Sequence, residues 1–160
     1  MIISTDIQLF ESQDQIDIGR IINLIQEGFG KKLTENYLQT EDISCIVIGG
    51  DYQGTAVLQD YNGWVYLDKF VVSPQHRNNG VGSEIFSYIL QNIGMFSEKS
   101  GLFWRSSGKN SLNRWYLKKI IEMQGGCRVK GEWVVYWIGG SQGDLDDIVE
   151  YGANKPHTLM

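Results

Sequence analysis

The segment Arg77–Gly82, with the sequence RNNGVG, has residue types and a spacing that suit the binding of a phosphate. It lies between an expected strand and an expected helix, so backbone N–H groups and the positive end of the helix dipole would converge there. Gly80 and Gly82 remove the Cβ atoms that would prevent close approach, and Arg77 adds a forked positive charge. This segment, the glycine loop, therefore predicts a phosphate site; the alternative is a tight turn that merely contains glycines.

The spacing in the glycine loop does not match two common nucleotide-binding patterns. No Gly-Lys-Ser/Thr sequence follows the glycines, as a P-loop requires. The loop also does not follow the first strand of the chain, where a dinucleotide fingerprint would lie. ATP and NAD are therefore not indicated as ligands.

Two other groups of residues have types that could do chemistry. The only cysteines and histidines are Cys45, Cys127, His76 and His157, and their wide separation does not predict a metal site. Residues 139–143 fit the Gly-x-Ser-x-Gly pattern of a hydrolase nucleophile elbow. Only a short segment follows them, and a hydrolase is therefore a weaker hypothesis than phosphate binding.

The first half of the chain predicts helices followed by an antiparallel pair of strands. Isoleucines recur at helical spacing over residues 15–28, and a shorter helix with Thr34 as its N-cap should follow. Runs rich in β-branched and aromatic residues at 43–48 and 55–61 are joined by a glycine-rich turn, which is typical of a hairpin.

The next segment should be the strongest strand, Trp64 to Ser73, after which the apolar pattern changes to a helical period. An apolar stripe predicts a helix over 83–94, with Ser83 at its start. Further elements should follow in the order strand, helix and a final pair of strands, at 101–106, 112–123, 127–129 and 133–138. The expected fold class is α/β, with a mixed sheet in three α/β/α layers over residues 1–143 and a C-terminal tail at 144–160.

Length and composition narrow the classes of function. The 160 residues suit one domain, and 42% hydrophobic with 21% charged residues is typical of a globular protein. A net charge of -5 without a long basic run disfavours nucleic-acid and anionic membrane partners. We expect a cytoplasmic protein with a small-molecule substrate. The aromatic strand at 133–137 could join a second subunit in a homodimer.

The glycine loop resembles the acyl-CoA pyrophosphate loop of the GCN5-related N-acetyltransferase (GNAT) superfamily, whose pattern is Arg/Gln, two residues, Gly, one residue, Gly/Ala. Three further segments resemble the acetyltransferase (NAT) domain of N-acetylglutamate synthase, in the same order: FGKKL at 29–33, YLDKF at 66–70 and LFWRSSGKNSLNRWY at 102–116. The resemblance covers about residues 16 to 139. It implies a GNAT fold whose central strands splay apart, with acetyl-CoA as co-substrate and no metal.

The resemblance also implies a reaction, the transfer of acetyl from acetyl-CoA to the α-amine of L-glutamate in arginine biosynthesis. Tyr116 would donate a proton to the departing thiolate. The substrate would be bound by Lys31, Lys69, Arg105 and Asn110. The co-substrate would be held by strand amides, the glycine loop and one helix amide, at Phe70, Val71, Val72, Arg77, Asn78, Asn79, Gly80, Val81, Gly82, Ser83 and Asn113.

Taken alone, several of these residues also fit structural roles. Tyr116 lies on an apolar helical stripe and could be a core aromatic, and Asn113 could be a solvated polar residue. Lysines are usually surface charges, but Lys69 lies in an apolar strand where an unpaired ammonium would be costly. We expect Asp68 to tether a backbone or cationic group rather than to act as a base.

The chain departs from the family pattern at Ser107, where the family usually has a second arginine. Loss of one forked cation would change how a dicarboxylate binds. Two alternatives therefore stay open. One is a GNAT enzyme that acts on a different amino acid or small amine. The other is a non-catalytic regulatory module that binds acetyl-CoA, as in similar domains fused to acetylglutamate kinases.

Overall fold

The computed structural model describes residues 6–160, and the chain divides into two compact units. The first unit contains Asp68–Asn92, His157–Met160 and the described part of Met1–Gln59. The second contains Asp60–Leu67 and Ile93–Pro156. Each unit has its own hydrophobic core, and each holds part of the set of predicted site residues.

Strands of the first unit form an antiparallel meander. The hairpin expected from the sequence is confirmed, because Ile46 pairs with Val57 and Ile48 with Thr55. The preceding strand adds to it with Ile7 opposite Gly49. The strands are β1 (Ile7–Phe10), β2 (Cys45–Gly49), β3 (Gly54–Tyr61) and β4 (Trp64–Val72), the last two of which continue into the second unit.

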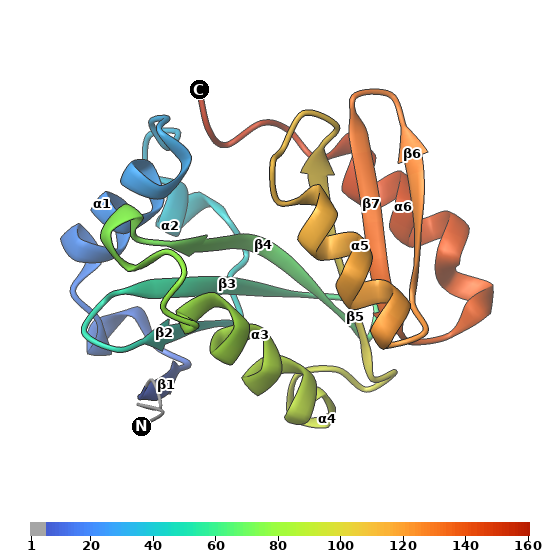
Figure 1. Ribbon diagram of the computed structural model, residues 1–160, viewed down its shortest axis with the longest axis horizontal. Coiled ribbons are helices and arrows are strands. Elements are labelled where there is room, and N and C mark those ends of the chain that lie inside the picture. The colour runs from blue at the N-terminus through green and yellow to red at the C-terminus, as the bar shows by residue number, and fades with distance from the viewer. Residues whose placement is uncertain (1–5) are drawn as a thin grey trace. The chain divides into compact units, whose positions relative to one another are not determined.

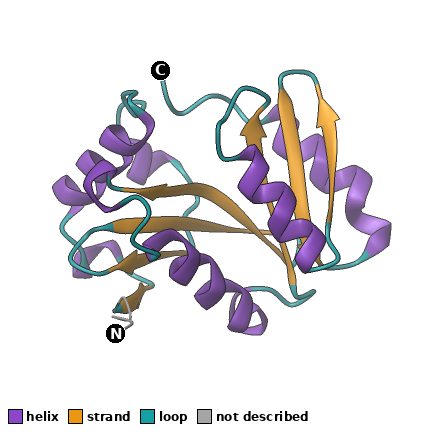
Figure 2. Ribbon diagram, viewed as in Figure 1, coloured by secondary structure: helices purple, strands orange, loops and turns teal. Residues whose placement is uncertain are grey.

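Helices cover both faces of this part of the sheet, as Figures 1 and 2 show. Helix α1 (Ile18–Phe29) approaches β4 so closely that a Cβ on Gly28 would lie 1.8 Å from a methyl of Val71. Helix α3 (Val81–Gln91) places Phe86 5.9 Å from Phe70. Because alternate residues of a strand point to opposite faces, α1 and α3 lie on opposite sides of β4.

The second unit repeats this layering. On one face of its strands, helix α5 (Asn113–Glu122) places the ring of Tyr116 5.3 Å from that of Trp104. On the other face, Gly152 of helix α6 (Leu145–Asn154) lies close to Val135 and Phe103. Figure 2 shows the two helices on either side of the strands. The other elements of this unit are α4 (Ile93–Phe96), β5 (Gly101–Ser107), β6 (Gly126–Lys130) and β7 (Trp133–Gly139).

The strands pair in the order β1-β2-β3-β4-β5-β7-β6, which gives a seven-stranded mixed sheet. Strands β4 and β5 pair in parallel, at Val65↔Leu102 and Tyr66↔Phe103. Both strands continue beyond this register, β4 to Val72 and β5 to Ser107. The expected α/β fold class is confirmed.

Several helix starts differ from the sequence prediction; α1 begins at Ile18 rather than at 15, after Asp17 as its N-cap. Helix α3 begins at Val81 rather than at 83, with Gly80 at its N-cap, so Ser83 lies inside the first turn instead of capping it. Val81 is only 2% exposed, and its packing in the core adds the two residues before Ser83 to the helix. The short helix α2 (Tyr37–Thr40) starts after Asn36, and Thr34 contributes only a carbonyl that accepts the N–H of Tyr37.

The segment expected to be a tail contains α6. Its residues Leu145, Ile148, Val149 and Gly152 have helical spacing, and Ile148 is fully buried in the core of the second unit. This helix is not predicted above, because its apolar pattern is short. Strand β7 also differs from expectation, because it is paired with β5 on one side and β6 on the other. The backbone of β7 is therefore already paired on both edges, and the expected homodimer stays a prediction.

None of the helices among residues 6–160 has the length and apolar character needed to cross a membrane.

Candidate active site

The glycine loop forms the connection between β4 and α3 in the first unit. Asn78 and Gly80 have left-handed backbones, with φ of 71° and 84°. The N–H of Glu84 donates to the carbonyl of Gly80 at 3.0 Å, so the N–H groups of the three residues before Glu84 precede the ordinary helical pattern. Among the described residues, no side chain caps this end. An anion would be stabilised by these donors and by the helix dipole.

Gly82 brings the start of α3 against the end of β4. A Cβ at this position would lie 3.1 Å from a methyl of Val72 and 3.4 Å from the ring of Phe70. Around Gly80, by contrast, a Cβ would meet nothing within 4 Å. The structure therefore brings the predicted phosphate loop beside strand residues 70–72 and leaves space around the loop's first glycine.

Arg77 is exposed, and its guanidinium already has one protein partner. Its Nη2 donates to the carbonyl of Gly28 at 2.7 Å. This bond ties the glycine loop to the last turn of α1. It restricts the guanidinium, whose remaining donors have the geometry to contact phosphate oxygens.

Lys69 is buried in a small polar cluster of the first unit. Its Nζ lies 3.2 Å from Oδ2 of Asp68 and 2.6 Å from the hydroxyl of Thr158, and 5.0 Å from the ring centre of Tyr37. The Tyr37 hydroxyl donates to the same Asp68 carboxylate oxygen. The expectation that Asp68 tethers a cationic group is confirmed. The alternative prediction that Lys69 is a surface charge is wrong, because the residue is only 6% exposed.

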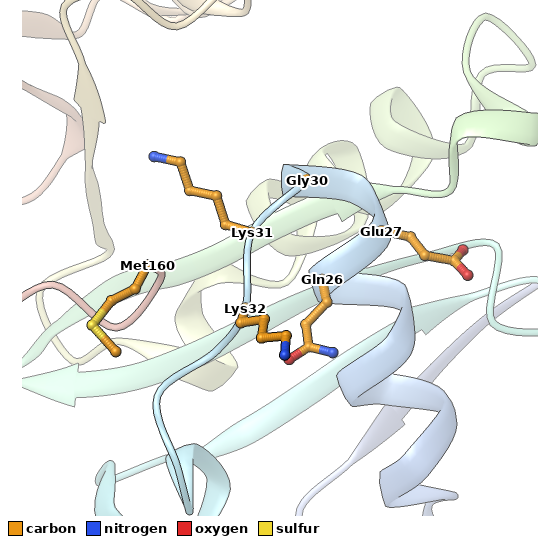
Figure 3. Close-up of a pocket in the computed structure, with 6 residues that line it drawn as sticks. All are labelled: Gln26, Glu27, Gly30, Lys31, Lys32 and Met160. Atoms are coloured by element: carbon orange, nitrogen blue, oxygen red, sulfur yellow. The ribbon is translucent and has the colours of Figure 1, made fainter.

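Lys31 is exposed and lines a pocket of the first unit, shown in Figure 3. Its side chain points away from that of Lys32, which lines the same pocket. The other lining residues are Gln26, Glu27, Gly30 and Met160. Of the predicted substrate residues, Lys31 and Lys69 thus lie in the first unit, and both segments contact the end of the described chain.

Arg105 lies in β5 of the second unit and donates hydrogen bonds to the last turn of α6 and to the residues that follow it. Its guanidinium donates to the carbonyls of Gly152 at 3.1 Å and Pro156 at 3.0 Å, and also to that of Lys155. It stacks 3.8 Å from the ring centre of Trp133. These contacts hold the guanidinium in one plane.

The two predicted asparagines order the turn between β5 and α5. Asn110 Oδ1 accepts the N–H of Leu112 at 2.8 Å. Asn113 donates from Nδ2 to the carbonyl of Ser107 at 2.9 Å, and its Oδ1 accepts the Tyr136 hydroxyl at 2.9 Å. Asn113 is thus held by the protein on both sides of its amide. Its predicted contact with the co-substrate stays a prediction.

Tyr116 lies in α5, 5% exposed, and packs against the stacked rings of Trp104 and Tyr136, each 5.3 Å away. Burial raises the pKa of the Tyr116 phenol above its usual value, and nearby Tyr136 raises it further. The phenol therefore keeps its proton at neutral pH. It has the protonation state that a proton donor needs, and it also fills the core, as the alternative interpretation expected.

Cys45 and the Gly-x-Ser-x-Gly segment noted in the sequence have structural roles. Burial raises the pKa of Cys45 to about 11, so it is a thiol rather than a nucleophilic thiolate at neutral pH. In the Gly-x-Ser-x-Gly segment, a Cβ on Gly140 would lie 2.1 Å from Trp64, so this glycine permits close packing. No group of metal-ligating side chains is found among residues 6–160.

Tyr37 and Thr158 both contact the Asp68–Lys69 pair, and neither is predicted from the sequence. Thr158 is separated from Lys69 by 89 positions. No spacing pattern connects residues so far apart. The only available signal was the expectation that a lysine in an apolar strand must have partners.

Comparison with solved structures defines the class of fold. The ribosomal-protein-S18-alanine N-acetyltransferase of Escherichia coli superposes with a TM-score of 0.67 at 11% identity, covering 87% of this chain and 96% of that one. A PaiA N-acetyltransferase from Thermoplasma acidophilum, solved in complex with coenzyme A, gives a TM-score of 0.58 at 13% identity, covering 84% and 99%. The fold is that of the GCN5-related N-acetyltransferases.

A family model for the N-acetyltransferase (NAT) of N-acetylglutamate synthase matches residues 8–155, and the chain belongs to this family. The mitochondrial N-acetylglutamate synthase of Danio rerio is 31% identical over 96% of this chain and 28% of that protein. An acetylglutamate kinase of Xanthomonas campestris is 28% identical over 93% of this chain and 34% of that protein. The chain thus spans about a third or less of these relatives.

Proposed function

We propose that this chain transfers the acetyl group of acetyl-CoA to the α-amine of L-glutamate. The observation that carries the proposal is the glycine loop at the start of α3, packed through Gly82 against strand residues 70–72 in a chain of the NAT family. The product, N-acetylglutamate, would place the protein in arginine biosynthesis. We place this reaction in the cytoplasm.

Acetyl-CoA fits the donor set around the glycine loop. Its diphosphate would accept hydrogen bonds from the amides of residues 78–83, and Arg77 would add a charge-assisted contact. Gly80 suits this role because a Cβ there would occupy otherwise open space beside the loop. The amides of Phe70, Val71 and Val72 would hold the pantetheine arm and polarise the thioester carbonyl.

The reaction needs no covalent enzyme intermediate. The neutral amine of glutamate attacks the thioester carbonyl carbon, the carbon–sulfur bond breaks, and the amine nitrogen loses a proton to water. Tyr116 gives its phenolic proton to the departing sulfur and regains one from solvent. Tyr116 is protonated at neutral pH, as a proton donor must be, and its raised pKa makes the phenol a weaker acid than a free tyrosine.

The two carboxylates of glutamate would be bound by Lys31, Lys69 and Arg105, with Asn110 as an additional donor. Lys69 supports this assignment most strongly, because its ammonium is buried and held by Asp68. An ammonium that is already fixed loses less side-chain freedom on binding a carboxylate than a mobile surface lysine does.

An acceptor panel tests the proposal. Purified protein is incubated with acetyl-CoA and one of L-glutamate, L-aspartate, L-glutamine or L-ornithine, and release of the CoA thiol is followed. We expect glutamate to give the highest kcat/KM. Equal or faster reaction with an amino acid that lacks the second carboxylate would overturn the glutamate assignment.

A second candidate is acetyl transfer to a different amino acid. It is favoured by the three carbonyls that already accept hydrogen bonds from Arg105, and by the serine at position 107. Both features reduce the number of cations available to a dicarboxylate. The same panel distinguishes the two candidates.

A further inference from the structure

The segment His157–Met160, the 157–160 strap, is attached to the loop that carries Lys31. Leu159 forms an antiparallel bridge with Leu33. Three backbone hydrogen bonds hold it: Lys32 N–H to Met160 O at 3.0 Å, Met160 N–H to Lys32 O at 2.8 Å, and Thr34 N–H to Thr158 O at 2.8 Å. The strap is therefore an ordered part of the first unit.

The same strap contacts Lys69. The hydroxyl of Thr158 accepts a hydrogen bond from Lys69 Nζ at 2.6 Å, on an ammonium that also lies 3.2 Å from the Asp68 carboxylate. A lysine side chain has four flexible carbons, so partners on two sides are needed to fix its ammonium. Asp68 supplies one and Thr158 the other.

We propose that Thr158 is a positioning residue for Lys69 and that the 157–160 strap sets the affinity for the acceptor amino acid. The inference rests on the proposed function, in which Lys69 binds a carboxylate of the acceptor. Thr158 acts through Lys69 rather than on the reacting atoms. The backbone bridge to Leu33 fixes Thr158, and it fixes the neighbouring Lys31 loop at the same time.

The test removes the Thr158 hydroxyl while keeping the shape of the side chain. In Thr158→Val the ammonium of Lys69 loses one partner, and we expect KM for glutamate to rise about tenfold, as for loss of one hydrogen bond to a charged group. The kcat and the Kd for acetyl-CoA should stay unchanged. Thr158→Ser keeps the hydroxyl and should restore the wild-type KM.

Thr55→Val is the matched control. Thr55 is a buried threonine of the same unit, and its hydroxyl donates to the carbonyl of Val47 at 2.8 Å. The control loses one hydroxyl hydrogen bond without touching Lys69, so its KM should equal that of the wild type. Thr158→Ala removes the same hydroxyl with less bulk, and it should give the same rise in KM if Thr158→Val does not fold.

An unchanged KM in both Thr158→Val and Thr158→Ala would overturn the inference while leaving the proposed function intact. A lower KM would also overturn it, because the strap would then obstruct the site rather than position Lys69. A wild-type protein that acetylates no amino acid would overturn the proposed function, and this inference with it.

Discussion

Lys69 has both a proposed binding role and a buried ion pair with Asp68, whose side chains are 7% and 3% exposed. Removing one partner of such a pair leaves the other charge buried without a counter-ion, which lowers the free energy of unfolding by about 3–5 kcal/mol. We expect Lys69→Met to lose both stability and glutamate turnover. The double variant Asp68→Asn/Lys69→Met should recover most of the stability but none of the turnover.

Urea unfolding and steady-state kinetics measure the two effects separately. Asp68→Asn keeps an oxygen that can accept the Tyr37 hydroxyl, so the double variant leaves no charge unpaired. If turnover returned together with stability, Lys69 would be architectural and would not bind substrate.

Tyr116→Phe removes the proposed proton donor and preserves the ring that packs against Trp104. General-acid catalysis contributes about 10²–10⁴ in rate, so we expect kcat to fall at least about tenfold with little change in KM. The control is Tyr61→Phe, which loses a hydroxyl bonded to Asp147 in the same unit and should keep its kcat. An unchanged kcat in Tyr116→Phe would remove Tyr116 from the mechanism.

Individual site residues were predictable only where a motif or a physical conflict marked them. The apolar neighbours of Lys69 indicated that its charge needs a partner, and the adjacent Asp68 is that partner. No motif indicates Thr158, because its contact with Lys69 forms only when the end of the chain pairs with Leu33. The buried position of Tyr116 agrees with both of its interpretations, so the sequence could not decide between them.

A substitution at Gly80 tests whether the glycine loop binds the diphosphate of acetyl-CoA. The φ of Gly80, 84°, is strained for any residue with a Cβ, by about 1–2 kcal/mol. Gly30, at the C-cap of α1, also has a positive φ, of 66°, with open space around it. Gly80→Ala and Gly30→Ala should therefore lose similar stability.

Only the first of these variants should bind acetyl-CoA more weakly, because only Gly80 borders the proposed diphosphate. Isothermal titration with acetyl-CoA, alongside urea unfolding, makes the comparison. Equal acetyl-CoA affinity in the two glycine variants would contradict the placement of the diphosphate.

Periodicity located most elements, and neighbouring packing set their ends. The stripe of apolar residues over α3 predicted a helix, but the buried Val81 moved its start ahead of Ser83. In α6 the apolar positions are few and lie among acidic residues, so the helix was overlooked although Ile148 is fully buried. Short amphipathic segments depend on a partner surface that the sequence does not display.

For the whole molecule, acid should weaken the contacts around Asp144. Hydrogen bonds from Lys99 and Trp64 hold the pKa of Asp144 below its usual 3.8. A lowered pKa in the folded state adds stability above pH 3.8, and this part is lost as the pH falls through the folded value. Melting curves between pH 7 and pH 3 should show a smaller drop in Tm for Asp144→Asn than for wild type. Parallel curves would mean that this carboxylate does not contribute.

The most direct measurement of the central claim is a mass-spectrometric assay with enzyme in excess over acetyl-CoA, with and without L-glutamate. We predict one N-acetylglutamate for each acetyl-CoA consumed, and no consumption beyond slow hydrolysis when glutamate is omitted. Tight binding of acetyl-CoA without acetylation of glutamate would contradict the account and leave two alternatives, an enzyme with a different acceptor and a non-catalytic module, which the acceptor panel separates.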